Sequence, residues 1–156
     1  MIRTSNIKDF DDIVSLENHC FKESERINFD GLYKRLLNHS SHSYVLVNDD
    51  KVCAYLTYVL SDKLELDDEM FGDNPQDYND GKYIIILGLA CDPLYKNQGY
   101  ASKLMNYLLD NTNKDILLTC HDYLIPFYEK FNFKLKGISN SSYSNETWYD
   151  MIYYAK

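Results

Sequence analysis

The sequence predicts a mixed α/β domain with one central sheet and helices on both of its faces. Three observations predict it. Residues 83–91 form an apolar run without polar alternation, which is typical of a central strand covered on both faces. A turn at 96–101 contains a glycine, follows that strand and opens a helical pattern. Strand-like and helical patterns alternate elsewhere, and the 156 residues predict a single domain over 1–156.

The first part of the chain is predicted to hold a short strand, two helices and a hairpin. Residues 1–5 can form the strand. Apolar residues recur at helical spacing over 9–21 and 29–38, which predicts the two helices. Two apolar runs within 44–60 flank the polar turn 48–51, a pattern that predicts a β-hairpin.

An acidic stretch separates this hairpin from the central strand. Residues 61–81 carry Gly72, Pro75 and Gly81, and they are predicted to form a long loop with a short helical turn around 67–71. Inside the strand itself, Gly88 indicates a bulge or a close approach by another backbone or a ligand.

The second part of the chain continues with helix, strand, helix and two strands. The apolar stripe of the helix that follows the turn comprises Ala101, Leu104, Met105, Leu108 and Leu109. Residues 115–120 are predicted to form a strand, and two final strands are expected within 133–154 around the polar turn 139–145.

The last helix has its own local signals. Asp122 is predicted to cap its N-terminus, and Pro126 falls in the first turn, where a missing N–H does least harm. Asn132 follows the helix and tolerates a left-handed backbone. The helical stripe consists of Leu124, Phe127, Tyr128 and Phe131.

Charge and composition exclude several functions. The formal net charge of −8 argues against nucleic acid as a partner and is compatible with a cationic substrate. No apolar run is long enough to span a bilayer and the N-terminus does not open a signal peptide, so we expect no membrane partner and a cytoplasmic location. The four cysteines form no C-x-x-C pair and fit no zinc pattern, so no metal is expected.

The turn Lys96-Asn97-Gln98-Gly99-Tyr100-Ala101 is the first candidate site. A strand that feeds a tight turn at a helix N-terminus presents free backbone N–H groups and the positive end of the helix dipole. Phosphate is the commonest biological ligand of such a turn, although one glycine after one strand also fits a simple connection.

Two motifs together resemble the GNAT superfamily of acyl-CoA-dependent N-acetyltransferases. The family signature Gln/Arg-x-x-Gly-x-Gly/Ala is matched by Gly99 and Ala101, with Lys96 at its first position. About thirty residues later, the segment 120–133 resembles the family's strand-to-helix segment that ends in Phe-Tyr-x-x-x-Gly-Phe. The implied fold is a mostly antiparallel sheet of six to seven strands with about four helices on both faces, in which two parallel strands splay apart at the cofactor site.

Within the superfamily, the 120–133 segment is most similar to arylalkylamine N-acetyltransferases, which carry Cys-x-Asp-x-x-x-Pro-Phe-Tyr here. Those enzymes place two histidines on the central strand, whereas the matching positions in this chain are Ile85 and Leu87. Serotonin-type specificity is therefore not expected.

The resemblance implies that acetyl-CoA donates an acetyl group to a primary amine by direct attack of the amine on the thioester. Backbone groups of the strand end would hold the pantetheine arm, with the Leu89 N–H on the thioester oxygen, and the turn amides would bind the pyrophosphate. The cofactor-binding residues implied are Leu89, Ala90, Cys91, Lys96, Asn97, Gln98, Gly99, Tyr100, Ala101 and Ser102.

The resemblance also places a tyrosine hydroxyl, that of Tyr128, beside the leaving sulfur as general acid. Periodicity alone favours a core residue at Tyr128, since it lies on the apolar stripe of its helix, whereas the motif favours the acid. The general base stays open: His121 is a candidate by position or else a solvated or capping histidine, and a Glu or Asp acting through water is an alternative.

Several expectations about the acceptor follow. The acidic residues Glu65, Asp67, Asp68, Glu69, Asp73, Asp77 and Asp80 either steer a cationic amine or form a solvated loop. Trp148 and Tyr149 either line the acceptor pocket or pack in the core. The leading function is acetylation of a small-molecule amine; a protein acetyltransferase acting on Lys or an N-terminus and a non-catalytic acyl-CoA-binding module are the alternatives. The family resemblance also suggests a homodimer.

Overall fold

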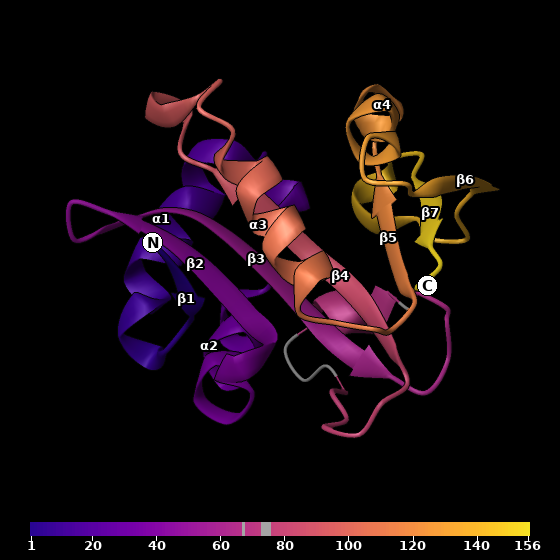
Figure 1. Ribbon diagram of the computed structural model, residues 1–156, viewed down its shortest axis with the longest axis horizontal. Helices are drawn as coiled ribbons and strands as arrows, with labels where there is room; N and C mark the ends of the chain where they lie inside the picture. The colour runs from indigo at the N-terminus through magenta and orange to yellow at the C-terminus, as the bar shows by residue number, and fades with distance from the viewer. Residues whose placement is uncertain (67, 73–75) are drawn as a thin grey trace.

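A single seven-stranded sheet organises the protein (Figure 1). The computed structural model describes residues 1–66, 68–72 and 76–156. The sheet has the order β1-β2-β3-β4-β5-β7-β6, and every neighbouring pair is antiparallel except β4 and β5, which are parallel. The strands are β1 (Ile2–Thr4), β2 (Ser43–Asn48), β3 (Lys51–Ser61), β4 (Tyr83–Cys91), β5 (Ile116–Cys120), β6 (Lys134–Ile138) and β7 (Tyr149–Tyr153).

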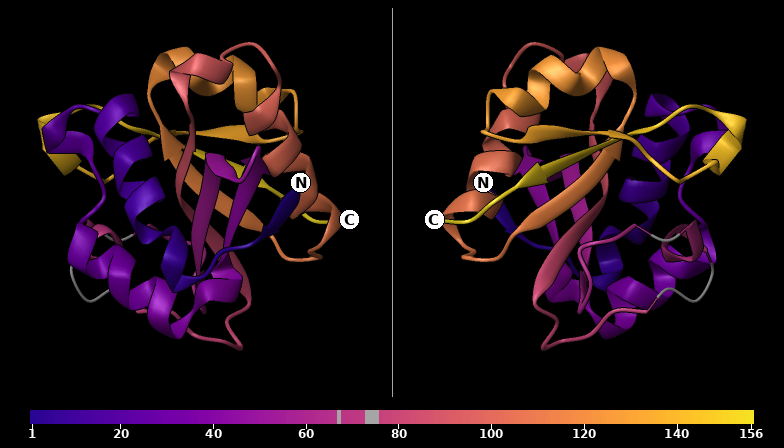
Figure 2. Two further views of the ribbon diagram at one scale, coloured as in Figure 1. Left: turned by 90° about the vertical axis from the view of Figure 1, so that its left-hand side faces the viewer. Right: turned by 90° about the vertical axis from the view of Figure 1, so that its right-hand side faces the viewer.

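Helices cover both faces of this sheet, as predicted (Figure 2). On one face lie α1 (Phe10–Cys20) and α2 (Phe29–Asn38), and on the other lie α3 (Tyr100–Asp110) and α4 (Ile125–Glu129). Because side chains of a strand alternate between faces, β3 and β4 are apolar on both sides and contribute to two cores.

Local chemistry accounts for the ends of several elements. The Asn28 side chain accepts the Gly31 N–H at 2.9 Å and caps α2. In the β2–β3 turn, Asp49 and Asp50 have φ of 51° and 61°, values that short polar residues tolerate in tight hairpins. Gly81 is required because a Cβ there would lie 2.7 Å from the Ser61 backbone nitrogen.

Most predicted elements are confirmed within two residues, including the helix over 29–38 and the helical turn in the acidic loop, which is η4 (Asp68–Phe71). Asp67 and Asp73 lie outside the described residues. The last helix differs from its prediction. A 3₁₀ turn, η6 (Asp122–Leu124), precedes α4. The N-cap residue of η6 is His121 rather than Asp122. Pro126 lies in the first turn of α4, as predicted, and Asn132 adopts a φ of 69°.

Candidate active site

The parallel strands β4 and β5 separate soon after they start to pair. Only Ile84 with Ile116 and Ile85 with Leu117 are in register, so the later residues of both strands form no ladder with each other. Figure 1 shows the two strands diverging toward the end of β5 that leads into α4. The predicted splay is therefore present.

A bulge in β4 accompanies the separation. Thr57 of β3 is opposite Gly88 and Tyr58 is opposite Ile86, which leaves Leu87 as the extra residue. The bulge shifts the side-chain alternation by one, so Leu89 and Cys91 face the α3 side while Ala90 faces the α1–α2 side. The bulge predicted from Gly88 is confirmed one residue away.

The same register decides which backbone groups of β4 are available. Asp92 donates its N–H to the Cys53 carbonyl at 2.7 Å, and hydrogen-bonded pairs alternate along an antiparallel ladder. The main-chain groups of Ala90 therefore point to β3, whereas those of Leu89 and Cys91 point into the gap. Cys91 O accepts the Cys20 thiol at 3.2 Å, and the N–H of Leu89 is a donor that faces the gap.

The turn before α3 leaves backbone N–H groups without helical partners at a helix N-terminus. Gly99 has a φ of 74° and an open space where a Cβ would lie, and Asn97 also has a positive φ of 69°. The first helical hydrogen bond runs from Lys103 N–H to Gly99 O at 2.9 Å, so the amides of Tyr100, Ala101 and Ser102 precede the helical ladder.

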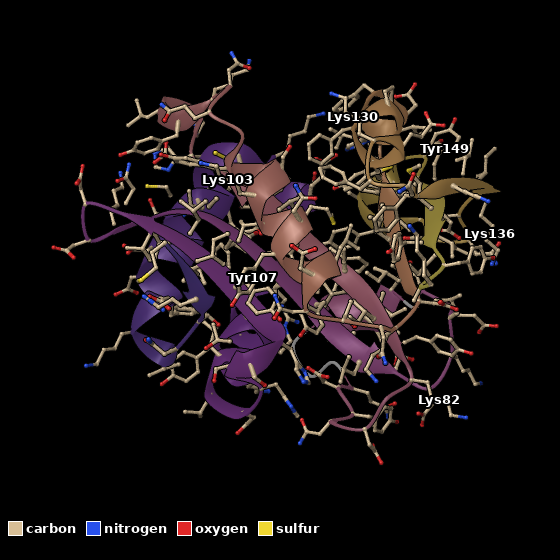
Figure 3. All side chains as sticks on the ribbon, in the orientation of Figure 1. Lys82, Lys103, Tyr107, Lys130, Lys136 and Tyr149 are labelled. Atoms are coloured by element: carbon tan, nitrogen blue, oxygen red, sulfur yellow. The ribbon has the colours of Figure 1, made fainter. Side chains whose placement is uncertain are left out.

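Gln98 and Tyr100 of this turn contact neighbouring residues. The Gln98 amide donates to the Tyr95 carbonyl at 3.3 Å, so it is engaged within the turn rather than presented with the helical amides. The Lys103 ammonium lies 5.4 Å from the centre of the Tyr100 ring on the first turns of α3 (Figure 3). Lys96 is exposed and adds a second positive charge beside the turn.

A cavity of about 270 Å³ continues from the gap between β4 and β5. Residues of α1, β4, β5 and α4 form its walls, and three further segments contribute lining residues. Its lining includes Glu17, Cys20, Phe21, Glu25, Phe71, Leu89, Cys120, His121, Tyr128, Ser141, Tyr143 and Trp148.

Hydrogen bonds join these three segments to one another. We call residues 22–26, 68–71 and 139–148 together the roof. Tyr143 donates its hydroxyl hydrogen to the Arg26 carbonyl at 2.5 Å. Its ring stacks on the ring of Phe71, with 5.1 Å between the two centroids. Ser141 donates its hydroxyl to the Asp68 carboxylate. The roof thus joins segments that contribute to the cavity lining and lie far apart in the sequence.

Tyr128 lines the cavity from α4 and is 8% exposed. Burial, reinforced by the nearby Cys120, raises the pKa of its phenol above the ordinary value, so the hydroxyl stays protonated at neutral pH. Within the described part of the chain the hydroxyl makes no hydrogen bond, which leaves it free to donate to a group in the cavity.

His121 lies at the opposite wall, at the end of β5. Its Nε2 is 3.1 Å from Glu25 Oε1, and its ring packs against Trp148 at 4.4 Å between centroids. This pairing fixes the orientation of the imidazole at the cavity wall. Trp148 thus lines the pocket, whereas Tyr149 belongs to β7 and is outside the lining (Figure 3).

Glu17 is the site residue that the sequence did not single out. It lies on α1, is 2% exposed, lines the cavity and accepts the Ile27 N–H at 3.2 Å. Burial raises the pKa of its carboxyl to about 7, although the Ile27 N–H, Arg35 and Arg26 favour the ionised form. Its place on the apolar stripe of the 9–21 helix was the available signal, because a carboxylate on a buried face needs a function or a partner.

The acidic residues of 61–81 that the structure describes do not all share one exposed surface. Asp68 belongs to the roof, and Asp77 is buried against His42, whose Nδ1 lies 2.8 Å from its carboxylate. Electrostatic attraction of a cation therefore depends on the exposed acidic residues of 61–81.

A protein-family comparison now bears on this geometry. The model of the acetyltransferase (GNAT) family matches residues 10–133. The chain belongs to the GNAT acetyltransferase family. No curated protein sequence matches it.

Solved structures agree on the fold of this acetyltransferase. The loading GNATL domain of CurA from Lyngbya majuscula has a TM-score of 0.84 at 15% identity, covering 98% of this chain and 96% of that one. The GphF GNAT-like decarboxylase in complex with isobutyryl-CoA has a TM-score of 0.80 at 16% identity, with both chains fully covered. The ribosomal-protein-S18-alanine N-acetyltransferase from Escherichia coli has a TM-score of 0.70 at 16% identity, covering 97% and 91%.

One further finding concerns membranes. Among the helices of residues 1–66, 68–72 and 76–156, none combines the length and the apolar character needed to cross a bilayer.

Proposed function

We propose that this acetyltransferase transfers an acetyl group from acetyl-CoA to the primary amine of a small molecule. The observation that carries the proposal is the shared cavity of Glu17 and Tyr128, which begins where β4 and β5 separate. A carboxyl group with a pKa of about 7 is matched to proton transfer at neutral pH, and a neutral phenol can donate to a leaving thiolate.

The chain offers binding groups for acetyl-CoA at both ends of that molecule. The amides of Tyr100, Ala101 and Ser102 support a pyrophosphate site, with Lys96 as a nearby positive charge. The Leu89 N–H faces the gap, where it would polarise the thioester carbonyl. When bound, acetyl-CoA supplies the activated acyl group.

Glu17 and Tyr128 each carry out one of the two proton transfers. An alkylamine with a pKa near 10 is only about a thousandth neutral at pH 7, a cost of roughly 4 kcal/mol that a base reduces. Glu17 accepts the proton of the attacking nitrogen, directly or through water, and releases it to solvent. As the carbon–nitrogen bond forms and the carbon–sulfur bond breaks, Tyr128 donates its proton to sulfur and regains one from solvent. We assign His121 to orientation of the acceptor, because its Nε2 is already paired with Glu25.

The roof supports a small acceptor over a protein. A peptide needs an open groove for the residues on either side of its reactive amine, whereas the lining residues Tyr143 and Ser141 are tied by hydrogen bonds to Arg26 and Asp68, in segments that would have to part to admit a peptide chain. Aromatic walls at Phe71 and Trp148 favour an amine with an apolar body. An arylalkylamine is one such acceptor, as the 120–133 segment suggests.

The test is an amine panel with acetyl-CoA, read by release of free thiol. The panel contains arylalkylamines, polyamines, amino acids, aminoglycosides, and lysine and N-terminal peptides. Release that depends on a small amine supports the proposal. Turnover of peptides alone favours the protein acetyltransferase, and coenzyme A binding without turnover favours the non-catalytic module. Thiol release that needs no amine, or no calorimetric heat from coenzyme A, contradicts the proposal.

Two expectations accompany this function. All four cysteines are free thiols, which supports a reducing compartment such as the cytoplasm. The homodimer suggested by the family is tested by sedimentation across a concentration series, where a constant monomer mass would contradict it.

A further inference from the structure

Two histidines and one carboxylate meet beyond the end of α2, outside the lining of the cavity. His39 and His42 lie at the start and end of the turn that contains the 3₁₀ segment η3 (Ser40–His42), and Asp77 comes from the loop before β4. One nitrogen of each imidazole and one Asp77 oxygen lie within 4.8 Å of one another. Cysteine spacing predicts no metal, and it does not bear on this cluster, whose carboxylate lies 35 residues after His42.

The backbone and the packing hold the two histidines together. The His42 N–H donates to the His39 carbonyl at 2.9 Å, which closes a turn and brings side chains three residues apart to one side. The two imidazole rings stack with 5.4 Å between centroids, and the His42 ring stacks in turn on Tyr58 of β3, also at 5.4 Å. His42 is 8% exposed, whereas His39 is half-buried, so solvent reaches the cluster through His39.

Oxygen atoms already orient both imidazoles. The two carboxylate oxygens of Asp77 lie 2.9 Å and 2.8 Å from His42 Nδ1, and Asn79 Oδ1 lies 3.1 Å from His39 Nδ1. Because a carboxylate or amide oxygen can only accept, each Nδ1 carries a hydrogen, and His39 Nε2 is left as an acceptor. Histidines that bind metals are oriented in this way by an oxygen on the other ring nitrogen.

We propose that His39, His42 and Asp77 form a binding site for a divalent transition-metal cation such as Zn²⁺. Two imidazole nitrogens, one carboxylate oxygen and a water that enters beside His39 make up the four ligands that a tetrahedral zinc ion takes. Such ligand atoms lie about 3.3 Å apart, so the 2.8 Å contact of His42 with Asp77 opens by about 0.5 Å and His39 turns toward it. The ion displaces the proton between His42 Nδ1 and Asp77, and that proton passes to His42 Nε2.

The donor set selects the kind of cation. Ca²⁺ and Mg²⁺ depend on several oxygen ligands, and Asp77 supplies the only carboxylate of this group. Imidazole nitrogens suit zinc, copper and nickel. The Arg35 guanidinium interacts electrostatically with Asp77 and opposes every cation there, which further favours ions that imidazole binds strongly.

A bound ion would join three parts of the fold. Asp77 accepts the Leu60 N–H at 2.9 Å and so already ties its loop to β3, and the two histidines belong to the turn after α2. A cation that binds the folded chain and not the unfolded chain stabilises the fold. Because the cluster lies outside the cavity lining, the inference is independent of the proposed acetyl transfer.

The test titrates the metal-free protein with zinc chloride, followed by calorimetry and by the melting temperature. Wild type is expected to bind one ion at this site and to melt at a higher temperature with zinc. His39→Gln should weaken zinc binding by at least about tenfold, because it removes one ligand. The control is His19→Gln, which removes an imidazole from an exposed position near the end of α1 and should bind zinc as wild type does.

A second variant addresses the carboxylate. Asp77→Asn keeps an oxygen for the Leu60 N–H and should weaken zinc binding by about 10–100-fold. The inference is overturned if wild type shows no saturable zinc binding, or if His39→Gln or Asp77→Asn binds zinc with wild-type affinity, since the ion would then be held elsewhere. Equal binding of calcium chloride also contradicts it, because general attraction to an acidic chain would then explain the result.

Discussion

Glu17→Gln is expected to increase stability at alkaline pH while removing most of the activity. In the folded protein the Glu17 carboxyl is 2% exposed, so its ionised form is held away from water. Glutamine has nearly the same shape, and its amide oxygen can still accept the Ile27 N–H. The substitution thus removes a buried negative charge with little change in packing.

The magnitude follows from the raised pKa. Burial moves the pKa of Glu17 from 4.5 to about 7, and each whole pKa step corresponds to about 1.4 kcal/mol. Ionisation of this one group therefore costs the folded state about 3 kcal/mol once the pH is above 7. For a chain of this size, such a change shifts the melting temperature by roughly 6–12 °C.

The pH dependence has a definite sign. A carboxyl whose pKa is higher in the folded than in the unfolded state adds stability below about pH 4.5, and this contribution is lost as the pH rises through about 7. The difference between Glu17→Gln and wild type should accordingly be small at pH 4.5 and reach about 3 kcal/mol at pH 8. Urea unfolding followed by circular dichroism across this range measures it.

The control is Glu23→Gln, which removes the same charge from an exposed position in the 3₁₀ turn η2 (Glu23–Glu25). Surface substitutions of this kind change the free energy of unfolding by about 0.5 kcal/mol or less. If the free energy of unfolding of Glu17→Gln equalled that of Glu23→Gln at every pH, burial would not disfavour the ionised form of Glu17. Its assignment as a base near neutral pH would then fail. Turnover of Glu17→Gln should fall by about 10²–10⁴-fold, as expected for loss of a general base.

Three other outcomes are expected. Tyr128→Phe should lower kcat by about 10²–10⁴-fold with unchanged binding of coenzyme A by calorimetry, and an unaltered kcat would remove the phenol from the mechanism. Gly99→Ala forces a side chain to a φ of 74°, which disfavours the turn conformation by roughly 1–2 kcal/mol; because the turn can relax in the free protein and must recover this conformation on binding, the dissociation constant for coenzyme A should rise by about 5–30-fold, and equal affinity would show that the turn does not hold the pyrophosphate. Gly81→Ala should lower the free energy of unfolding by about 1–3 kcal/mol, because its Cβ would lie 2.7 Å from the Ser61 nitrogen, and a neutral result in urea titration would show that the loop can move aside.

Local sequence determines much of this fold. The apolar period of 29–38 and the Asn28 cap act within a few residues, so the helix they predict begins and ends where expected. The apolar run of β4 predicts a strand covered on both faces, and the glycine-bearing turn predicts the start of α3. Tyr128 and the turn residues are predicted as site residues in the same way, because motifs of adjacent residues carry that prediction.

Local sequence does not predict features that depend on contacts between distant parts of the chain. Asp122 looks like a helix cap, yet the chain enters α4 through a 3₁₀ turn whose position depends on the end of β5. Ala90 lies between two residues that face the gap, but the phase of the β3–β4 ladder turns its main chain away. That phase depends on the pairing of two strands, which no local pattern encodes.

The sequence by itself determined the order of the elements, the family resemblance and the position of the glycine-bearing turn before α3, since these depend on neighbours along the chain. Tertiary structure alone decided that Glu17 of α1 shares a cavity with Tyr128 of α4 and lies within the field of Arg35 of α2. The physical reason is that burial and the electric field of other charges determine the proton affinity of a carboxyl group. Both are properties of the assembled core rather than of any segment.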